Sequence, residues 1–269
     1  IVPFLQSVVG SFHRSTAFGT RTVYVGLENY ARVLTSSDYH TSAIATLLFS
    51  GFVIVIGLAV SLVIALLLNQ KIRGLGFYQV AFVWTYAISP AVAGAIWALM
   101  FAPATGIAPF IIAKLSGGYL LNWMTNGPAA LLVVSIAATW NMLGYNIVFF
   151  LAGLQNISEE LVDSARVDGA GPWRTFWDIT FPMLSPTTTF LLFVNTIYAF
   201  FQVFGLIDIM THGGPGDATN ILIYKLYRDA FLYLDSGAAS AQSIIIFIVI
   251  SAAAIVQLHF AMRRAIYAR

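Results

Sequence analysis

Several long stretches of this sequence contain no charged side chain, and that feature constrains the fold more than any other. A helix needs about 20 apolar residues to cross a bilayer. Only 9% of the residues are charged and 59% are hydrophobic, and the mean hydropathy is +0.84. A soluble domain carries about 25% charged residues, so most of this chain must face lipid. The sequence therefore predicts an all-α, polytopic membrane protein.

The apolar runs predict about six transmembrane helices. The opening IVPFLQSVVGSF is too short to cross a bilayer and is interpreted as the tail of a truncated first span. The other predicted spans cover residues 41–69, 77–101, 128–154, 186–210 and 242–262. Ser89-Pro90 interrupts the third, where neighbouring polar groups can satisfy the freed carbonyls. Residues 13–40, 102–127 and 211–241 are expected to be loops, the last with short helical potential. Residues 1–269 thus form one transmembrane domain.

The basic residues suggest an orientation. Seven of the 13 lie at 70–75, in segment 155–185 and in the tail after residue 262. Cytoplasmic loops carry an excess of lysine and arginine, so these three regions are predicted to lie inside. Both termini would then be cytoplasmic.

Composition also excludes several classes. The chain has no cysteine, and its four histidines lie far apart, so no metal site is predicted. The net charge of +2 gives no nucleic-acid footprint. No GxxxxGK[ST] phosphate-binding loop occurs, so the chain has no nucleotide site of that type. An intramembrane enzyme would need catalytic groups at membrane depth, and none are grouped there.

Segment 155–185 is the most polar part of the chain, with five acidic and two basic residues. Glu159 and Glu160 suit the first turn of a short amphipathic helix. Gly169 suits a left-handed turn after it, and Pro172 can begin a second helix that Pro182 stops. Two interpretations remain open, a surface connector between spans or a docking element for a soluble partner. Some thirty residues are more than a connector needs, which favours docking.

DSARVDGAGPWRTFWDITFPMLSP, within this segment, resembles the cytoplasmic coupling motif of permease subunits in ATP-binding-cassette importers. That motif reads Glu-Ala-Ala, two residues, Asp-Gly-Ala, then Ile-x-Leu-Pro. Asp163, Ser164 and Ala165 stand at its first three positions, and Phe181 replaces the leucine. By this resemblance the predicted coupling residues are Glu160, Asp163, Ser164, Ala165, Asp168, Gly169, Ala170 and Pro172.

Three further segments, THGGPGDAT (211–219), LIYKLYRDAF (222–231) and AASAQSIIIF (238–247), are similar to the carbohydrate-uptake branch of these permeases. The likeness is greatest to permeases for glycerol-3-phosphate and glycerophosphodiesters. It implies a non-enzymatic, multi-pass subunit of a bacterial cytoplasmic membrane. Its expected partners are a second permease, two ATPase subunits that hold ATP and Mg²⁺, and an external solute-binding protein. A permease for a disaccharide or oligosaccharide is the alternative, and an ion-coupled secondary transporter is a distant one.

Polar side chains within spans mark the candidate solute pathway, since they are costly in a membrane. Two stripes at helical spacing supply them: Asn141 and Tyr145 in one span, and Asn195, Tyr198 and Gln202 in the next. The alternative is that the amides join helices. A phosphate needs a cation or several N–H donors, yet no lysine or arginine lies at mid-span. Lys225 and Arg228 could attract anions from an external loop, or could simply form a solvated face.

Overall fold

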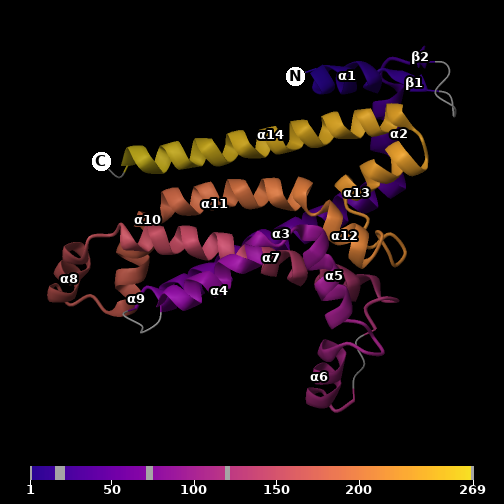
Figure 1. Ribbon diagram of the computed structural model, residues 1–269. Helices are drawn as coiled ribbons and strands as arrows, with labels where there is room; N and C mark the ends of the chain where they lie inside the picture. Colours follow the sequence, from indigo (N-terminus) through magenta and orange to yellow (C-terminus); the bar gives the residue numbers. More distant parts are fainter. Residues whose placement is uncertain (1, 16–21, 71–74, 119–121, 268–269) are drawn as a thin grey trace.

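The computed structural model describes residues 2–15, 22–70, 75–118 and 122–267 of the chain. Within these residues, three helices are long and apolar enough to cross a membrane unbroken: α3 (Ser37–Leu68), α7 (Gly127–Gln155) and α14 (Ser236–Tyr267). Their positions confirm the spans predicted at 41–69, 128–154 and 242–262. In Figure 1, α3 and α7 lie together in one part of the bundle, and α14 lies beyond α11 (Ser185–Ile197).

Two further spans are broken. α4 (Leu75–Ala87) and α5 (Pro90–Met100) meet at an angle of 101° across Ser89-Pro90. The expected interruption is thus a sharp corner between two helices. The second bend, of 64°, lies at Leu184, between the helical stretches Pro172–Met183 and Ser185–Gln202. The fifth predicted span follows this bend and consists of α11 (Ser185–Ile197), a π-helical turn η2 (Tyr198–Gln202) and α12 (Phe204–Met210).

The N-terminal region and the connections between spans hold the shorter elements. α1 (Val2–Ser11) lies along α14, and a hairpin of β1 (His13–Ser15) and β2 (Thr22–Tyr24) follows it. Next comes α2 (Glu28–Thr35). α6 (Ile107–Leu115) lies within residues 102–127, so the prediction of a plain loop there was wrong. α13 (Leu222–Tyr227) and a π-helical turn η3 (Arg228–Leu232) provide the helical structure expected in 211–241.

Helix α7 forms the centre of the bundle. In the most apolar 18-residue stretch of α7, 61% of the residues are buried. The corresponding share is 28% in α3 and in α14. α3 packs along one side of α7, and α4, α5 and α11 contact it as well. Its buried side carries small residues such as Ala130, Ala137 and Ala138, which let neighbouring helices approach closely. α3 and α14 thus present most of their apolar surface outward, as lipid-facing helices do.

Candidate functional site

Segment 155–185 folds as a helix, a glycine turn and a second helix, as predicted. α8 (Glu159–Val167) ends at Asp168, and Gly169 adopts φ = +79°, the left-handed conformation that favours glycine. The Ala170 N–H donates to the Ala165 carbonyl, which closes the turn. α9 (Pro172–Thr175) then begins at Pro172. The stop predicted at Pro182 was wrong, because a π-helical turn η1 (Phe176–Thr180) and α10 (Phe181–Met183) carry the helix past it.

The segment protrudes from one end of the bundle (Figure 1) and exposes its predicted coupling residues. No residue of α8 is buried. Glu160, Asp163, Ser164, Asp168, Gly169 and Pro172 are exposed, and Ala165 and Ala170 are half-buried. Apolar side chains beside them are exposed too, with Val167 at 88% and Trp173 at 76%. Exposed apolar groups among polar ones are typical of an interaction surface.

The flanks of the segment are anchored in the bundle. Leu154 at the end of α7 and Leu184 before α11 are buried in one apolar cluster with Ala65 and Leu68 of α3. The C-terminal end of α3 thus lies at the same end of the molecule as segment 155–185. The C-terminal end of α14 lies on that side as well (Figure 1). The grouping agrees with the common sidedness expected from the basic residues.

The first polar contact within the membrane region joins α7 to α11. Asn146 and Asn195 are fully buried and exchange two hydrogen bonds. Asn146 Nδ2 donates to Asn195 Oδ1 at 3.1 Å, and Asn195 Nδ2 donates to Asn146 Oδ1 at 2.7 Å. Asn195 Nδ2 also donates to the Leu191 carbonyl at 2.8 Å. Such paired amides can hold membrane helices together without exposing a polar group to lipid.

The second polar contact joins η2, α7 and the corner between α4 and α5. Asn141 is buried, and its Nδ2 donates to the carbonyl oxygens of Thr85 and Ile88, each at 3.0 Å. The Tyr198 hydroxyl donates to Asn141 Oδ1 at 3.1 Å, with the Ala138 carbonyl oxygen 3.3 Å away. The structure thus brings together Asn141 and Tyr198, which the sequence placed on separate stripes.

The other two pathway candidates are more accessible. Gln202 is exposed at the end of η2, and Tyr145 is half-buried on α7. Tyr145 continues a row of aromatic rings, with Tyr86 at 4.8 Å and Phe149 at 4.6 Å between ring centroids. Phe190 of α11 lies 5.1 Å beyond Phe149. Tyr86, Phe149 and Phe190 all retain more than a third of their surface, so this row forms part of the outer face of the chain.

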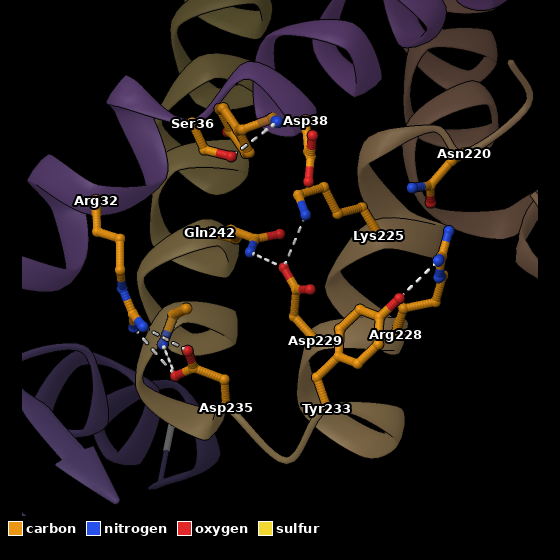
Figure 2. Close-up of polar contacts among 12 residues, drawn as sticks. Arg32, Ser36, Asp38, Asn220, Lys225, Arg228, Asp229, Tyr233, Asp235 and Gln242 are labelled. Carbon is orange, nitrogen blue, oxygen red and sulfur yellow. Dashed lines mark hydrogen bonds and ion pairs between the residues drawn. The ribbon is translucent and has the colours of Figure 1, made fainter. Parts of the chain in front are cut away.

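A polar cluster at the opposite end of the bundle contains Lys225 and Arg228, the two basic residues of segment 211–241. Figure 2 shows Lys225 and Gln242 pointing toward the Asp229 carboxylate. Lys225 Nζ lies 3.2 Å from Asp229 Oδ2, and both side chains are only 12% exposed. Gln242 Nε2 also donates to Asp229. Arg228 pairs with Asp217 and donates to the Tyr233 hydroxyl at 2.7 Å. Both cations thus have acidic partners within the chain.

The same end holds further internal polar contacts. Arg32 of α2 lies 2.8 Å from Asp235, just before α14. The Tyr224 hydroxyl donates to Asp208 at 3.2 Å. Burial, then the charge of Asp208 and this hydrogen bond, raise the pKa of Tyr224 to about 12, so the phenol remains protonated at neutral pH.

Sequence reasoning missed some partners in these networks. Thr85 and Asp229 gave no signal of their own, because their roles depend on contacts with other segments. Gly144 could have indicated the close approach of α4. A Cβ there would overlap the Phe82 carbonyl oxygen and lie 2.9 Å from Thr85 Oγ1. Within the described residues no group of histidine and acidic side chains could hold a metal ion.

The fold is a multi-pass helical bundle with a protruding helix–turn–helix at one end. Two solved structures share the fold: a bacterial ATP-binding-cassette transporter involved in the import of the acidic polysaccharide alginate, and the bacterial alginate transporter in complex with an alginate pentasaccharide-bound periplasmic protein. Each gives a TM-score of 0.81. They are 19% and 20% identical to this chain, cover 98% and 97% of it, and are themselves covered to 90% and 91%.

The family model for the inner-membrane component of binding-protein-dependent transport systems matches residues 91–266. The chain belongs to this family, and it is a permease subunit of an ATP-binding-cassette importer of the sugar-uptake type. This confirms the class that the coupling motif indicated and excludes an ion-coupled secondary transporter.

Among curated relatives, the sn-glycerol-3-phosphate transport system permease protein UgpA of Agrobacterium fabrum is 40% identical over 98% of this chain and 90% of its own length. The protein of the same name from Yersinia pestis is 41% identical over 93% of this chain and 84% of its own. Both relatives are permease subunits, which agrees with the prediction that the chain itself is not an enzyme.

Proposed function

We propose that this chain forms half of the translocation pathway of an importer for sn-glycerol-3-phosphate or a glycerophosphodiester. The observation that carries the proposal is the identity of about two residues in five, along nearly the whole chain, to permeases named for glycerol-3-phosphate. The alternative within the same class is a permease for a disaccharide or oligosaccharide. The proposed location is the bacterial cytoplasmic membrane, which is supported by the family's description as an inner-membrane component.

Segment 155–185 is proposed to dock on a cytoplasmic ATPase subunit. Its support is the exposure of the coupling residues together with the apolar side chains of Val167 and Trp173. ATP and Mg²⁺ would be held by two such ATPase subunits, so hydrolysis would occur outside this chain. A second, homologous permease and an external solute-binding protein complete the proposed complex.

Within the membrane, Tyr145 and Gln202 are proposed to face the solute, since they are the accessible members of the candidate set. The other three candidates, Asn141, Asn195 and Tyr198, would support the pathway without touching the solute. Their polar groups are hydrogen-bonded to other parts of the chain. The spans contain no lysine or arginine at mid-depth, so the phosphate would be met by backbone donors or by the second permease.

Uptake into proteoliposomes that contain the complete complex tests the solute. Radiolabelled glycerol-3-phosphate, delivered by the binding protein, should accumulate with ATP inside and not without it. Accumulation of a disaccharide in its place would overturn the proposed solute and favour the alternative. Capture of this chain without any ATPase would contradict the docking role of segment 155–185.

The pathway assignment has its own test. Gln202→Leu should raise the KM of uptake while basal ATP hydrolysis stays unchanged, because only a solute contact is removed. Gln70→Leu is the matched control, since Gln70 is an exposed glutamine at the end of α3. Equal KM values for the two variants and the wild type would remove Gln202 from the pathway.

A further inference from the structure

The corner between α4 and α5 creates a problem that the chain must solve within the membrane. The helices meet at 101°, and Pro90, the first residue of α5, has no N–H to donate. The last carbonyls of α4 therefore lose their helical partners. An unpaired backbone carbonyl is costly in a membrane, so this corner needs hydrogen-bond donors from elsewhere in the chain.

Asn141 supplies those donors. Both hydrogens of its Nδ2 are used, one for the Thr85 carbonyl and one for the Ile88 carbonyl, at 3.0 Å each. The side chain is only 2% exposed. One turn further along α7, the Gly144 N–H donates to Thr85 Oγ1 at 3.3 Å. α7 thus holds the end of α4 at two consecutive points, and only a glycine at 144 permits the approach.

Asn141 is held in turn by the element that follows segment 155–185. The Tyr198 hydroxyl, from η2, donates to Asn141 Oδ1. Tyr198 is 2% exposed and its ring packs in the main apolar core. Three residues earlier, Asn195 is bound to Asn146 of α7. The helices on either side of segment 155–185 are therefore joined to each other, and through Asn141 to the corner.

We propose that Asn141 is a positioning residue that fixes the angle between α4 and α5, and that Tyr198 orients it. Movement of α7 and α11 at segment 155–185 would reach the broken span through this contact. The angle itself is a property of this chain, whereas its consequence for transport rests on the proposed function.

The angle can be measured in the assembled complex. The chain contains no cysteine, so nitroxide labels can be placed at Phe77→Cys on α4 and Leu99→Cys on α5, both of which are exposed. Electron–electron double resonance in lipid nanodiscs should give one narrow distance distribution for otherwise wild-type protein. Asn141→Leu should shift or broaden it, because both carbonyls lose their donor.

Tyr198→Phe is the milder variant, which keeps the ring and removes only the hydroxyl. It should change the distance distribution in the same direction by a smaller amount. If Asn141→Leu does not assemble into the complex, the distribution of Tyr198→Phe tests the proposal in its place. Ser135→Ala is the matched control, since Ser135 is a buried residue of α7 whose hydroxyl donates within its own helix, to the Leu131 carbonyl. Its distribution should equal that of the wild type.

An unchanged distribution in the Asn141 and Tyr198 variants, or an equal change in Ser135→Ala, would overturn the proposal. Uptake gives the second measurement: Asn141→Leu should lower it about tenfold or more at saturating solute, the loss expected for buried hydrogen bonds. If Asn141→Leu raised the KM of uptake and left the distance between the labels unchanged, the proposal would be wrong and Asn141 would be assigned to contact with the solute. If the wild type imports no glycerol-3-phosphate, the proposed solute fails while the distance measurement still decides the role of Asn141.

Discussion

Segment 155–185 and the polar cluster around Asp229 lie at opposite ends of the bundle and treat their charges differently. In the segment, the ion pairs Asp163–Arg166 and Arg174–Asp178 have all four side chains more than 60% exposed. In the cluster, Lys225 and Asp229 are 12% exposed. Pairs in water contribute little to stability, while a buried charge depends strongly on its partner. The first region leaves its charges in water, as its proposed docking role requires, whereas the charges of the second region join parts of this chain to one another.

The largest effect is expected at the turn of segment 155–185. Gly169→Val forces a β-branched residue into φ = +79°, which costs about 1–2 kcal/mol and distorts the exposed surface. ATP-driven uptake should fall by about tenfold or more. Gly171→Val is the matched control, because Gly171 has φ = −71° and open space around it. Normal uptake by Gly169→Val would show that the turn has no part in coupling.

The next effect concerns the buried ion pair. Asp229→Leu leaves the Lys225 ammonium without its carboxylate, and we expect a loss of about 3 kcal/mol of stability. Thermal unfolding of the purified protein in detergent measures it. The double variant Lys225→Met/Asp229→Leu should recover much of the loss, since no unpaired charge remains. A single variant that melts like the wild type would contradict the view that this end is held by its internal pair.

A smaller effect is expected for the amide pair between α7 and α11. Asn195→Leu leaves Asn146 without its partner and should cost about 1–2 kcal/mol. The double variant Asn146→Leu/Asn195→Leu should lose less stability than the sum of the losses of the two single variants, because residues in direct contact are coupled. Strict additivity in the same unfolding measurement would indicate that the two amides do not interact.

The smallest effect is expected for the exposed pairs of segment 155–185. Arg166→Ala and Arg174→Ala should each change stability by less than about 0.5 kcal/mol. Their melting curves should overlie that of the wild type even if ATPase binding weakens. A large destabilisation would remove the contrast between the two ends.

Much of this architecture could be predicted because lipid imposes simple rules on sequence. The unbroken spans α3, α7 and α14 follow from uncharged apolar length alone. The turn at Gly169 and the helix start at Pro172 follow from local backbone preferences. α6 was missed because a short helix flanked by glycines and prolines resembles a loop, and the hairpin near the N-terminus was missed as well.

The candidate pathway shows where such prediction ends. Helical spacing correctly placed Asn195 and Tyr198 on nearby faces, but spacing within one helix cannot say what lies opposite. Asn195 meets Asn146, and Tyr198 meets Asn141. Gln202 and Tyr145 have similar local sequence signals, yet remain accessible.

The sequence by itself determined that the chain spans a membrane, where its long spans lie, and which segment carries the coupling motif. These properties depend on hydropathy and on contacts between near neighbours. Only the tertiary structure decided the 101° corner, the donors that satisfy it, and the pairing of Lys225 and Arg228 with acidic residues. Each of those features depends on which side chain, distant in the sequence, pairs with a buried polar group. A buried polar group without a partner would cost free energy, so these contacts stabilise the fold.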